Sequence, residues 1–379
     1  MSTATKSIEQ TFEKQQAGNI VRNNKKINRM FSALSKQLAR DIHTYELVHP
    51  TAFIGDPEAK LFYRKNKALQ RIIEKNMKQF SALMQGHTNG SMKENWALSN
   101  SKNDALVHEY LKSMGMLNSI ETAYLGLNLP AMKAFINRAE AGLNLSGRVW
   151  KTVSGASDQI EVYLGSGIAQ GRSASRLATD MNALLREPAR LYRRVRKDGK
   201  LVLSKAAAQY HPGAGVYRSA YQNALRMTAT ETNMAYRMSD FSRRQQLPFI
   251  TGIVVHLSAA HPRFDICDSM TGDYPKGFVF TGWHPRCWCY TTSKQLNRKG
   301  LVRYLKTGKV DPRQYTSSIP APAKEYLLEH KSQIRKMKNK PYFIQDNFTG
   351  KGELRKDVLR TRTTEQVLNT RQSAAKTAA

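Results

Sequence analysis

The chain has 379 residues and a formal net charge of +31 at pH 7, because 60 Lys and Arg residues outnumber 29 Asp and Glu residues. A hydrophobic content of 40% is enough for a buried core, so the composition excludes a chain that is disordered throughout. Three cysteines cannot all pair within one chain, which argues against a disulfide framework and favours folding in a reducing cytosol.

The excess of cations predicts a polyanionic partner, because a protein that neutralises phosphates releases their condensed counterions. Nucleic acid is the first candidate, and an anionic membrane surface or an acidic protein is the alternative. No apolar run approaches the roughly 18 residues that a membrane span requires, so we expect no membrane span. The polar N-terminal stretch lacks the apolar core of a secretory leader.

Apolar residues at helical spacing predict two long helices in the N-terminal region. The first stripe consists of Ile27, Phe31, Leu34, Leu38, Ile42 and Tyr45. The second helix is predicted for residues 56–86, with Asp56 as N-cap, Pro57 at the first helical position and Gly86 as the C-terminal stop. Its stripe consists of Phe62, Leu69, Ile73, Met77, Phe80 and Met84. The polar segment 86–104 that follows predicts a loop.

From Leu145 the pattern predicts a helix, a break at Gly171 and a second helix capped by Ser173. A basic turn follows in "LYRRVRKDGK". It is either a phosphate-binding loop or an exposed loop without a partner, and its candidate DNA contacts are Arg193, Arg194, Arg196 and Lys197.

A long helix is predicted for residues 217–244, and Glu231 interrupts its apolar stripe. A buried carboxylate is costly unless it is paired, so we expect Glu231 to meet an Arg, a Lys, backbone donors or a metal shell. A structural ion pair is the favoured interpretation, and a catalytic carboxylate is the alternative.

The pattern changes after Pro248. The β-branched segment 249–258 predicts a strand, and "FVFTGW", residues 278–283, predicts another. We therefore expect an α+β fold, predominantly helical, with a small strand-containing Cys/His module near residues 248–295. Beyond residue 300 the chain is basic and helical in patches, and it ends in "RQSAAKTAA", which predicts a disordered tail. Candidate DNA contacts there are Arg335, Lys336 and Lys338.

All three cysteines and two histidines lie in one short window of the chain. The candidate metal ligands are His261, Cys267, His284, Cys287 and Cys289. Thiolate and imidazole are the ligands that zinc prefers, and the glycines of this window suit a compact knuckle. Cys-x-Cys is tighter than the common Cys-x₂-Cys spacing, so three alternatives stay open: a redox pair, a Cys/His nucleophile, and packing without a metal.

Three segments together resemble the Mu F-like minor head proteins of tailed phages, also called head morphogenesis proteins. They are "LSGRVWKTVSGASDQIEVYLGSGIAQGRSASRLATDM", then "RMTATETNMAYR" with Thr230 and Glu231 on the motif, then a closing Cys/His pattern. The closing pattern consists of Asp265, Cys267, Asp268, Gly272, His284, Pro285, Cys287 and Cys289. Trp288 departs from the family, which usually has Arg between the two cysteines, so any role of that arginine is in doubt here.

The resemblance implies a low-copy, non-enzymatic structural protein, made in the host cytoplasm and located inside the capsid at the portal vertex. Its partners would be the portal protein, double-stranded DNA bound without sequence preference, and other capsid-interior proteins, and it would assist head assembly and DNA packaging or ejection. The expected organisation is a helical docking region at residues 1–139, the head morphogenesis domain at 140–297 and a basic region at 298–379.

Two other functions stay open. One is a metal-dependent nuclease or toxin-like enzyme, with a histidine between His256 and His284 as general base and Glu231 as metal or orienting group. The other is a cellular nucleic-acid-binding protein with a zinc knuckle.

Overall fold

The computed structural model describes residues 3–49, 66–116, 125–140, 142–169, 173–188, 191, 194–203, 217, 219–258, 264–337 and 339–377. The chain forms two compact units, each assembled from separate segments. Unit 1 comprises Met1–Ile20, Asn89–Asn144 and Ala229–Ala379, and unit 2 comprises Val21–Thr88 and Leu145–Thr228. These units differ from the consecutive segments 1–139, 140–297 and 298–379 that the sequence suggested, because long helices contribute to both. No described helix is both long and apolar enough to cross a lipid bilayer.

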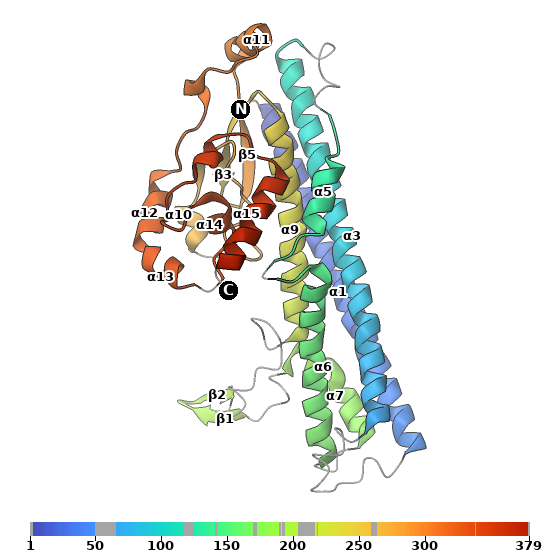
Figure 1. Cartoon of the computed structure of the whole chain (residues 1–379). Coiled ribbons are helices and arrows are strands. Elements are labelled where there is room, and N and C mark those ends of the chain that lie inside the picture. Colours follow the sequence, from blue (N-terminus) through green and yellow to red (C-terminus); the bar gives the residue numbers. More distant parts are fainter. Residues whose placement is uncertain are drawn as a thin grey trace. The chain divides into compact units, whose positions relative to one another are not determined.

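Unit 2 is a helical assembly with an apolar core. Its helical segments belong to α1 (Thr3–Val48), α3 (Lys67–Ser113), α6 (Leu145–Ala169), α7 (Ala174–Arg186) and α9 (Ala220–Gln246) (Figure 1). The described residues of both predicted stripes are buried except Tyr45, which is half-buried, and Phe31 meets Phe80 edge to face with ring centroids 4.8 Å apart. Ser173 caps α7 as predicted, by accepting a hydrogen bond from the Arg176 amide at 3.3 Å. Asp56, Pro57, Phe62 and Gly171 lie outside the described residues.

The loop predicted for residues 86–104 is wrong, because α3 continues through Gly86 and Gly90 to Ser113. Lys93, Glu94 and Ser101 are exposed, but many polar side chains of this segment are buried, namely Thr88, Ser91, Asn95, Ser99, Asn100, Lys102 and Asn103. Asn95 and Asn103 donate hydrogen bonds to carbonyl oxygens one turn earlier in the helix, at 2.9 and 2.8 Å, and Ser91 lies 2.7 Å from the Thr232 hydroxyl of α9. Hydrogen bonding inside the protein therefore replaces the solvation that a polar composition suggests.

The basic turn is a two-stranded hairpin. β1 (Arg194–Lys197) pairs antiparallel with β2 (Lys200–Leu203). Asp198 and Gly199 form the turn with φ of 51° and 74°, the left-handed conformation that a two-residue hairpin loop requires.

Unit 1 contains a three-stranded antiparallel sheet in the order β4-β3-β5. The strand predicted for residues 249–258 is confirmed as β3 (Ile250–His256), which lies between β4 (Gly272–Pro275) and β5 (Tyr290–Gln295). The second predicted strand, residues 278–283, is wrong. The Val279 amide donates to Asn347 Oδ1 at 2.8 Å and the Val279 carbonyl accepts from Asn347 Nδ2 at 2.9 Å, so one side chain takes the place of a neighbouring strand.

Short helices complete unit 1. They are α5 (Leu129–Ile136), α10 (Ile266–Ser269), α11 (Arg298–Thr307), α12 (Ala321–Glu329), α13 (Lys331–Lys336), α14 (Tyr342–Asn347), α15 (Thr364–Thr377) and two 3₁₀ helices, Pro312–Gln314 and Lys356–Leu359. Among them, α10, α12 and α14 share an apolar core with β3 and β4. The tail predicted to be disordered is helical through Thr377, because α15 buries Val367, Leu368 and Arg371. The architecture is the expected α+β fold, mostly helical with one small sheet.

Candidate metal centre

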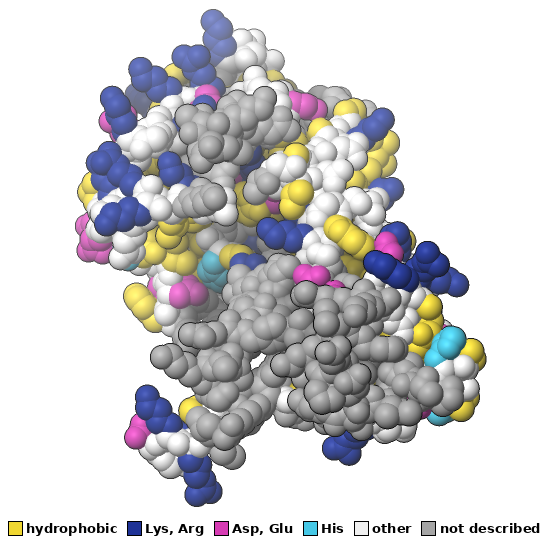
Figure 2. All heavy atoms as spheres, turned by 60° about the horizontal axis from the view of Figure 1, so that its bottom comes forward, with side chains coloured by type: hydrophobic (Ala, Val, Ile, Leu, Met, Phe, Trp, Pro, Cys, Tyr) yellow, Lys and Arg dark blue, Asp and Glu magenta, His cyan; other side chains and the backbone are white. Residues whose placement is uncertain are grey.

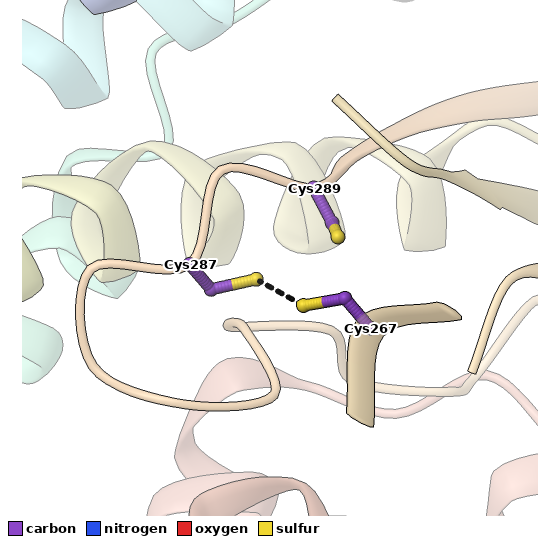
Figure 3. Close-up of side chains that lie close together, drawn as sticks. All are labelled: Cys267, Cys287 and Cys289. Carbon is purple, nitrogen blue, oxygen red and sulfur yellow. Dashed lines mark hydrogen bonds between the residues drawn. The ribbon is translucent and has the colours of Figure 1, made fainter. Parts of the chain in front are cut away.

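The three cysteines approach one another from two sides of the module in unit 1. Cys267 lies in α10, Cys287 in the turn before β5, and Cys289 immediately before the first residue of β5. All three side chains are buried, and Figure 3 shows their sulfur atoms directed into one space. Cys267 is distant in the sequence from Cys287 and Cys289, and the sheet brings them together, because β4, which follows Cys267, and β5, which follows Cys289, both pair with β3.

The sulfur atoms are close enough to bind one ion together. Cys267 Sγ lies 3.9 Å from Cys287 Sγ, and the three Sγ atoms all lie within 4.8 Å of one another. A tetrahedral thiolate centre separates its sulfur atoms by about 3.8 Å. The cluster can therefore hold a metal ion with small adjustments of the side chains.

A second group shares Cys267 with the first. His284 Nε2 lies 3.1 Å from Cys267 Sγ and 3.4 Å from Asp265 Oδ2. His284 Nδ1 lies 2.9 Å from the Pro285 carbonyl oxygen, and it is the donor in this hydrogen bond because a carbonyl oxygen can only accept. The predicted ligands within the described residues therefore divide into two overlapping groups. One is Cys267 with Cys287 and Cys289, and the other is Cys267 with His284, joined by Asp265, which was not predicted as a ligand.

The predicted motif residues Asp265 and Asp268 hold α10 in place. Asp265 Oδ1 accepts from the Cys267 amide at 2.7 Å, and Asp268 Oδ2 accepts from the Asp265 amide at 2.8 Å, which together form a capping box. Gly272 begins β4 with a φ of 120°, and an added Cβ atom would lie 2.8 Å from Pro320 Cγ. Pro285 is exposed in the turn between His284 and Cys287.

Hydrogen bonding within the cluster favours one thiolate. The Cys267 and Cys289 thiols donate toward Cys287 and lower its pKa, while the same interaction raises the pKa of Cys267. A thiolate is the form that binds a metal ion.

Arg237 of α9 binds the backbone around the cysteine cluster. Its guanidinium donates to the carbonyl oxygens of Cys287 at 2.7 Å, Cys289 at 2.6 Å and Thr281 at 3.1 Å. Gly282 makes room for it, because an added Cβ atom would lie 2.6 Å from Arg237 Nη1. Sequence reasoning missed Arg237, although its place one turn after Met234 and one turn before Phe241 puts a charge on the buried face of the helix.

Glu231 is paired, as the sequence predicted, and its partner is Arg138. Arg138 Nη2 donates to Glu231 Oε2 at 2.8 Å, and Arg138 Nε donates to Glu140 Oε1 at 2.5 Å. The network continues from Glu140 to Arg371, which binds Asp346 through two hydrogen bonds of 2.7 and 2.8 Å. Thr230 lies beside Glu231 in α9 and is half-buried.

A second buried network in unit 1 centres on Asp240. It accepts from Lys102 at 2.8 Å, from Thr291 at 3.0 Å and from Arg244. Neither Asp240 nor Lys102 was a candidate from sequence, because Lys102 falls in the segment predicted to be a loop. Its burial follows from the continuation of α3.

The candidate DNA contacts lie on two separate units. Arg196 and Lys197 are exposed on the hairpin of unit 2, where Arg194 begins β1, and Arg335 and Lys336 are exposed on α13 of unit 1. His261, Arg193 and Lys338 lie outside the described residues.

Comparison with known proteins gives no relative. No protein-family model, no curated protein and no solved structure matches this chain.

Proposed function

We propose that this protein is a structural minor head protein of a tailed phage, located inside the capsid at the portal vertex, which binds double-stranded DNA without sequence preference. Its partners would include the portal protein and other capsid-interior proteins, and its work would be head assembly and DNA packaging or ejection.

The observation that carries the proposal is the contrast between interior and surface cations. The buried Arg138 and Arg371 are paired with carboxylates, since Arg138 meets Glu231 at 2.8 Å and Arg371 meets Asp346 at 2.7 Å. The exposed cations of the hairpin, α11 and α13 that form no ion pair within the described part of the chain include Arg196, Lys197, Lys299, Lys306, Arg335 and Lys336, whereas Arg303 of α11 pairs with Asp311. These exposed cations contribute to the net charge of +31 and are therefore available to bind a polyanion outside the protein.

The head-protein assignment gains support from the way two of its motif segments meet. Arg237 is the last residue of "RMTATETNMAYR", and it holds the carbonyl groups of Cys287 and Cys289 in the closing pattern. Two segments that resemble the family separately are thus parts of one packed arrangement in unit 1. This is the relationship expected of a structural signature.

We propose that the metal is zinc and that its role is structural. Cys267, Cys287 and Cys289 would supply three thiolates, and a side-chain rotation would bring His284 to the fourth position. Such a site has no open coordination position for a hydrolytic water. Glu231, the carboxylate that a nuclease mechanism would use, is already bound to Arg138, which favours the structural role over the enzymatic alternative.

DNA binding is tested by fluorescence anisotropy with duplexes of unrelated sequence over a range of salt concentrations. We expect similar affinities for all sequences and a steep, linear fall of log K with log salt. In unit 2, the hairpin variant R196Q/K197Q/K200Q should reduce the salt slope by about 2–3. The matched control K25Q/K26Q/R29Q removes the same charge from exposed positions of α1 in the same unit and should reduce it less. Affinity that barely changes with salt would overturn the proposal.

A further inference from the structure

Unit 1 contains a groove that the DNA-binding proposal does not use. It has a volume of about 770 Å³ and lies between helices α12 and α13 on one side and α14 with the following turn on the other. Its floor is apolar and consists of Ile319, Leu327, Ile334, Ile344, Phe348 and Leu354. The volume falls in the range of about 300–1,000 Å³ that is typical of binding pockets.

The walls of this groove are ordered elements. On one side Lys324, Leu328, Lys331 and Arg335 follow one another along α12 and α13. On the other side the Thr349 amide donates to the Glu353 carbonyl at 2.8 Å and the Gly352 amide donates to the Thr349 carbonyl at 2.9 Å, which closes a tight turn. Leu328 lies at the groove with 68% of its surface exposed, so an apolar side chain remains uncovered there.

The rim of the groove is strongly cationic. Five cations line it against one carboxylate, Glu353; the cations are Lys324, Lys331, Arg335, Lys340 and Lys351. None of the five forms an ion pair with any residue in the described ranges. Figure 2 shows dark blue Lys and Arg side chains beside yellow hydrophobic ones on the left, where α12 and α13 lie.

We propose that this groove docks an acidic, amphipathic helical segment of a partner protein. The apolar floor matches leucine-like side chains repeated at helical spacing, and the cations match carboxylates that flank them. The cations lie on both walls, so they suit several acidic groups along an extended ligand better than the single carboxylate of a fatty acid. Duplex DNA offers phosphates but no apolar side chains to cover the floor.

The test uses the full chain and a labelled peptide with leucine at positions i, i+3, i+4 and i+7 and glutamate elsewhere. Its control is a scrambled peptide of the same composition, and a mixed-sequence DNA duplex is measured in parallel. We expect the patterned peptide to bind at least about tenfold more tightly than the scrambled one.

Variants locate the binding site. L328Q and K331E/R335E should each weaken peptide binding at least about tenfold, whereas K299E/K306E, with the same charge change on exposed positions of α11, should leave it within about twofold. Circular dichroism and the thermal midpoint verify that each variant folds. Equal binding of both peptides, or unchanged binding by L328Q, overturns the proposal. If K331E/R335E loses DNA binding while the peptide fails to bind, the rim is a DNA contact instead and the docking proposal falls, whereas the proposed DNA-binding function stands.

Discussion

Arg237 Nη2 donates a hydrogen bond to the carbonyl oxygen of Cys289 at 2.6 Å and so fixes the backbone where the cysteine cluster meets β5. The same guanidinium holds the Cys287 and Thr281 carbonyl groups. We expect Arg237→Met to lower the free energy of unfolding by about 3 kcal/mol or more, because three carbonyl groups of buried residues lose a charged donor. Arg237→Lys should recover less than half of that loss, since one ammonium cannot reach all three oxygens.

Urea denaturation followed by circular dichroism measures both Arg237 variants. Arg176→Met, which removes an exposed cation from α7, is the control and should change stability by less than about 0.5 kcal/mol. A loss in Arg237→Met no larger than in this control would contradict the structural role of Arg237.

The cysteine cluster predicts about one zinc ion per chain in protein purified without chelator. Cys267→Ser removes the residue shared by both candidate ligand groups, so the zinc content should fall at least about tenfold and the thermal midpoint should fall with it. Elemental analysis measures the metal, and thiol titration before and after chelation measures accessibility. His330→Asn, a histidine substitution in α12–α13, is the control. If the purified protein contained no metal and its thermal midpoint were the same with and without chelator, a structural zinc would be refuted.

The Arg138–Glu231 pair predicts an asymmetric response to mutation. Arg138→Met removes the guanidinium that bonds both the Glu231 and the Glu140 carboxylates in a buried site, so it should cost about 3–5 kcal/mol of unfolding free energy. The double variant R138M/E231M should be more stable than R138M, because it removes one of these two carboxylates. A double-mutant cycle measured by denaturation checks this, and strictly additive effects would argue against the pair.

Asn347 takes the place of a strand beside Val279, with hydrogen bonds of 2.8 and 2.9 Å to its amide and carbonyl groups. Asn347→Ala should therefore lower the unfolding free energy by about 2–4 kcal/mol, because both backbone groups are buried. Asn347→Asp should also destabilise, since a carboxylate can accept from the amide but cannot donate to the carbonyl. If Asn347→Asp matched wild type in a urea titration, the side chain would not have this role.

Stability should fall between pH 4.5 and 7 because of Glu9 of α1. Burial raises the pKa of Glu9 from 4.5 to about 7, and Lys102, Asp240, Glu13 and the Ser293 backbone face it. The folded state therefore holds a proton that the unfolded state has released in this window, so stabilisation present below pH 4.5 is lost as pH rises through 7.

Glu9→Gln should remove this contribution and stabilise the protein at pH 8 by on the order of 2–3 kcal/mol relative to wild type. Denaturation at pH 5 and pH 8 measures the effect. Glu329→Gln, at an exposed position, is the control. Parallel pH profiles for wild type and Glu9→Gln would contradict the buried carboxyl.

Periodicity in the sequence predicted the apolar stripes of the long helices, the Ser173 cap, strand β3 and the pairing of Glu231, because each depends on local pattern or on the cost of one buried charge. The continuation of α3 past Gly86 was not predictable in this way. Its asparagines and Lys102 are polar, and their burial becomes favourable through partners within α3 and on α9, such as Asp240. Residues 278–283 have the composition of a strand, but Asn347, far along the chain, satisfies Val279 instead.

The candidate metal ligands show the same limit of prediction from sequence. The sequence identified Cys267, His284, Cys287 and Cys289 as candidates, because thiol and imidazole groups are rare and lie close together in this chain. It could not indicate that they divide into two overlapping groups, nor that Arg237 from a distant helix holds the backbone between two of them. Both depend on how the sheet and α9 pack.

Quantitative mass spectrometry of phage particles purified from cells that carry the gene tests directly whether this protein is a head component at the portal vertex, as we propose. We expect the protein in intact particles at a few copies per portal, in heads that have not packaged DNA as well, and in a complex with portal protein after mild disruption. Detection in the host cytosol with none in purified particles or portal complexes would contradict it.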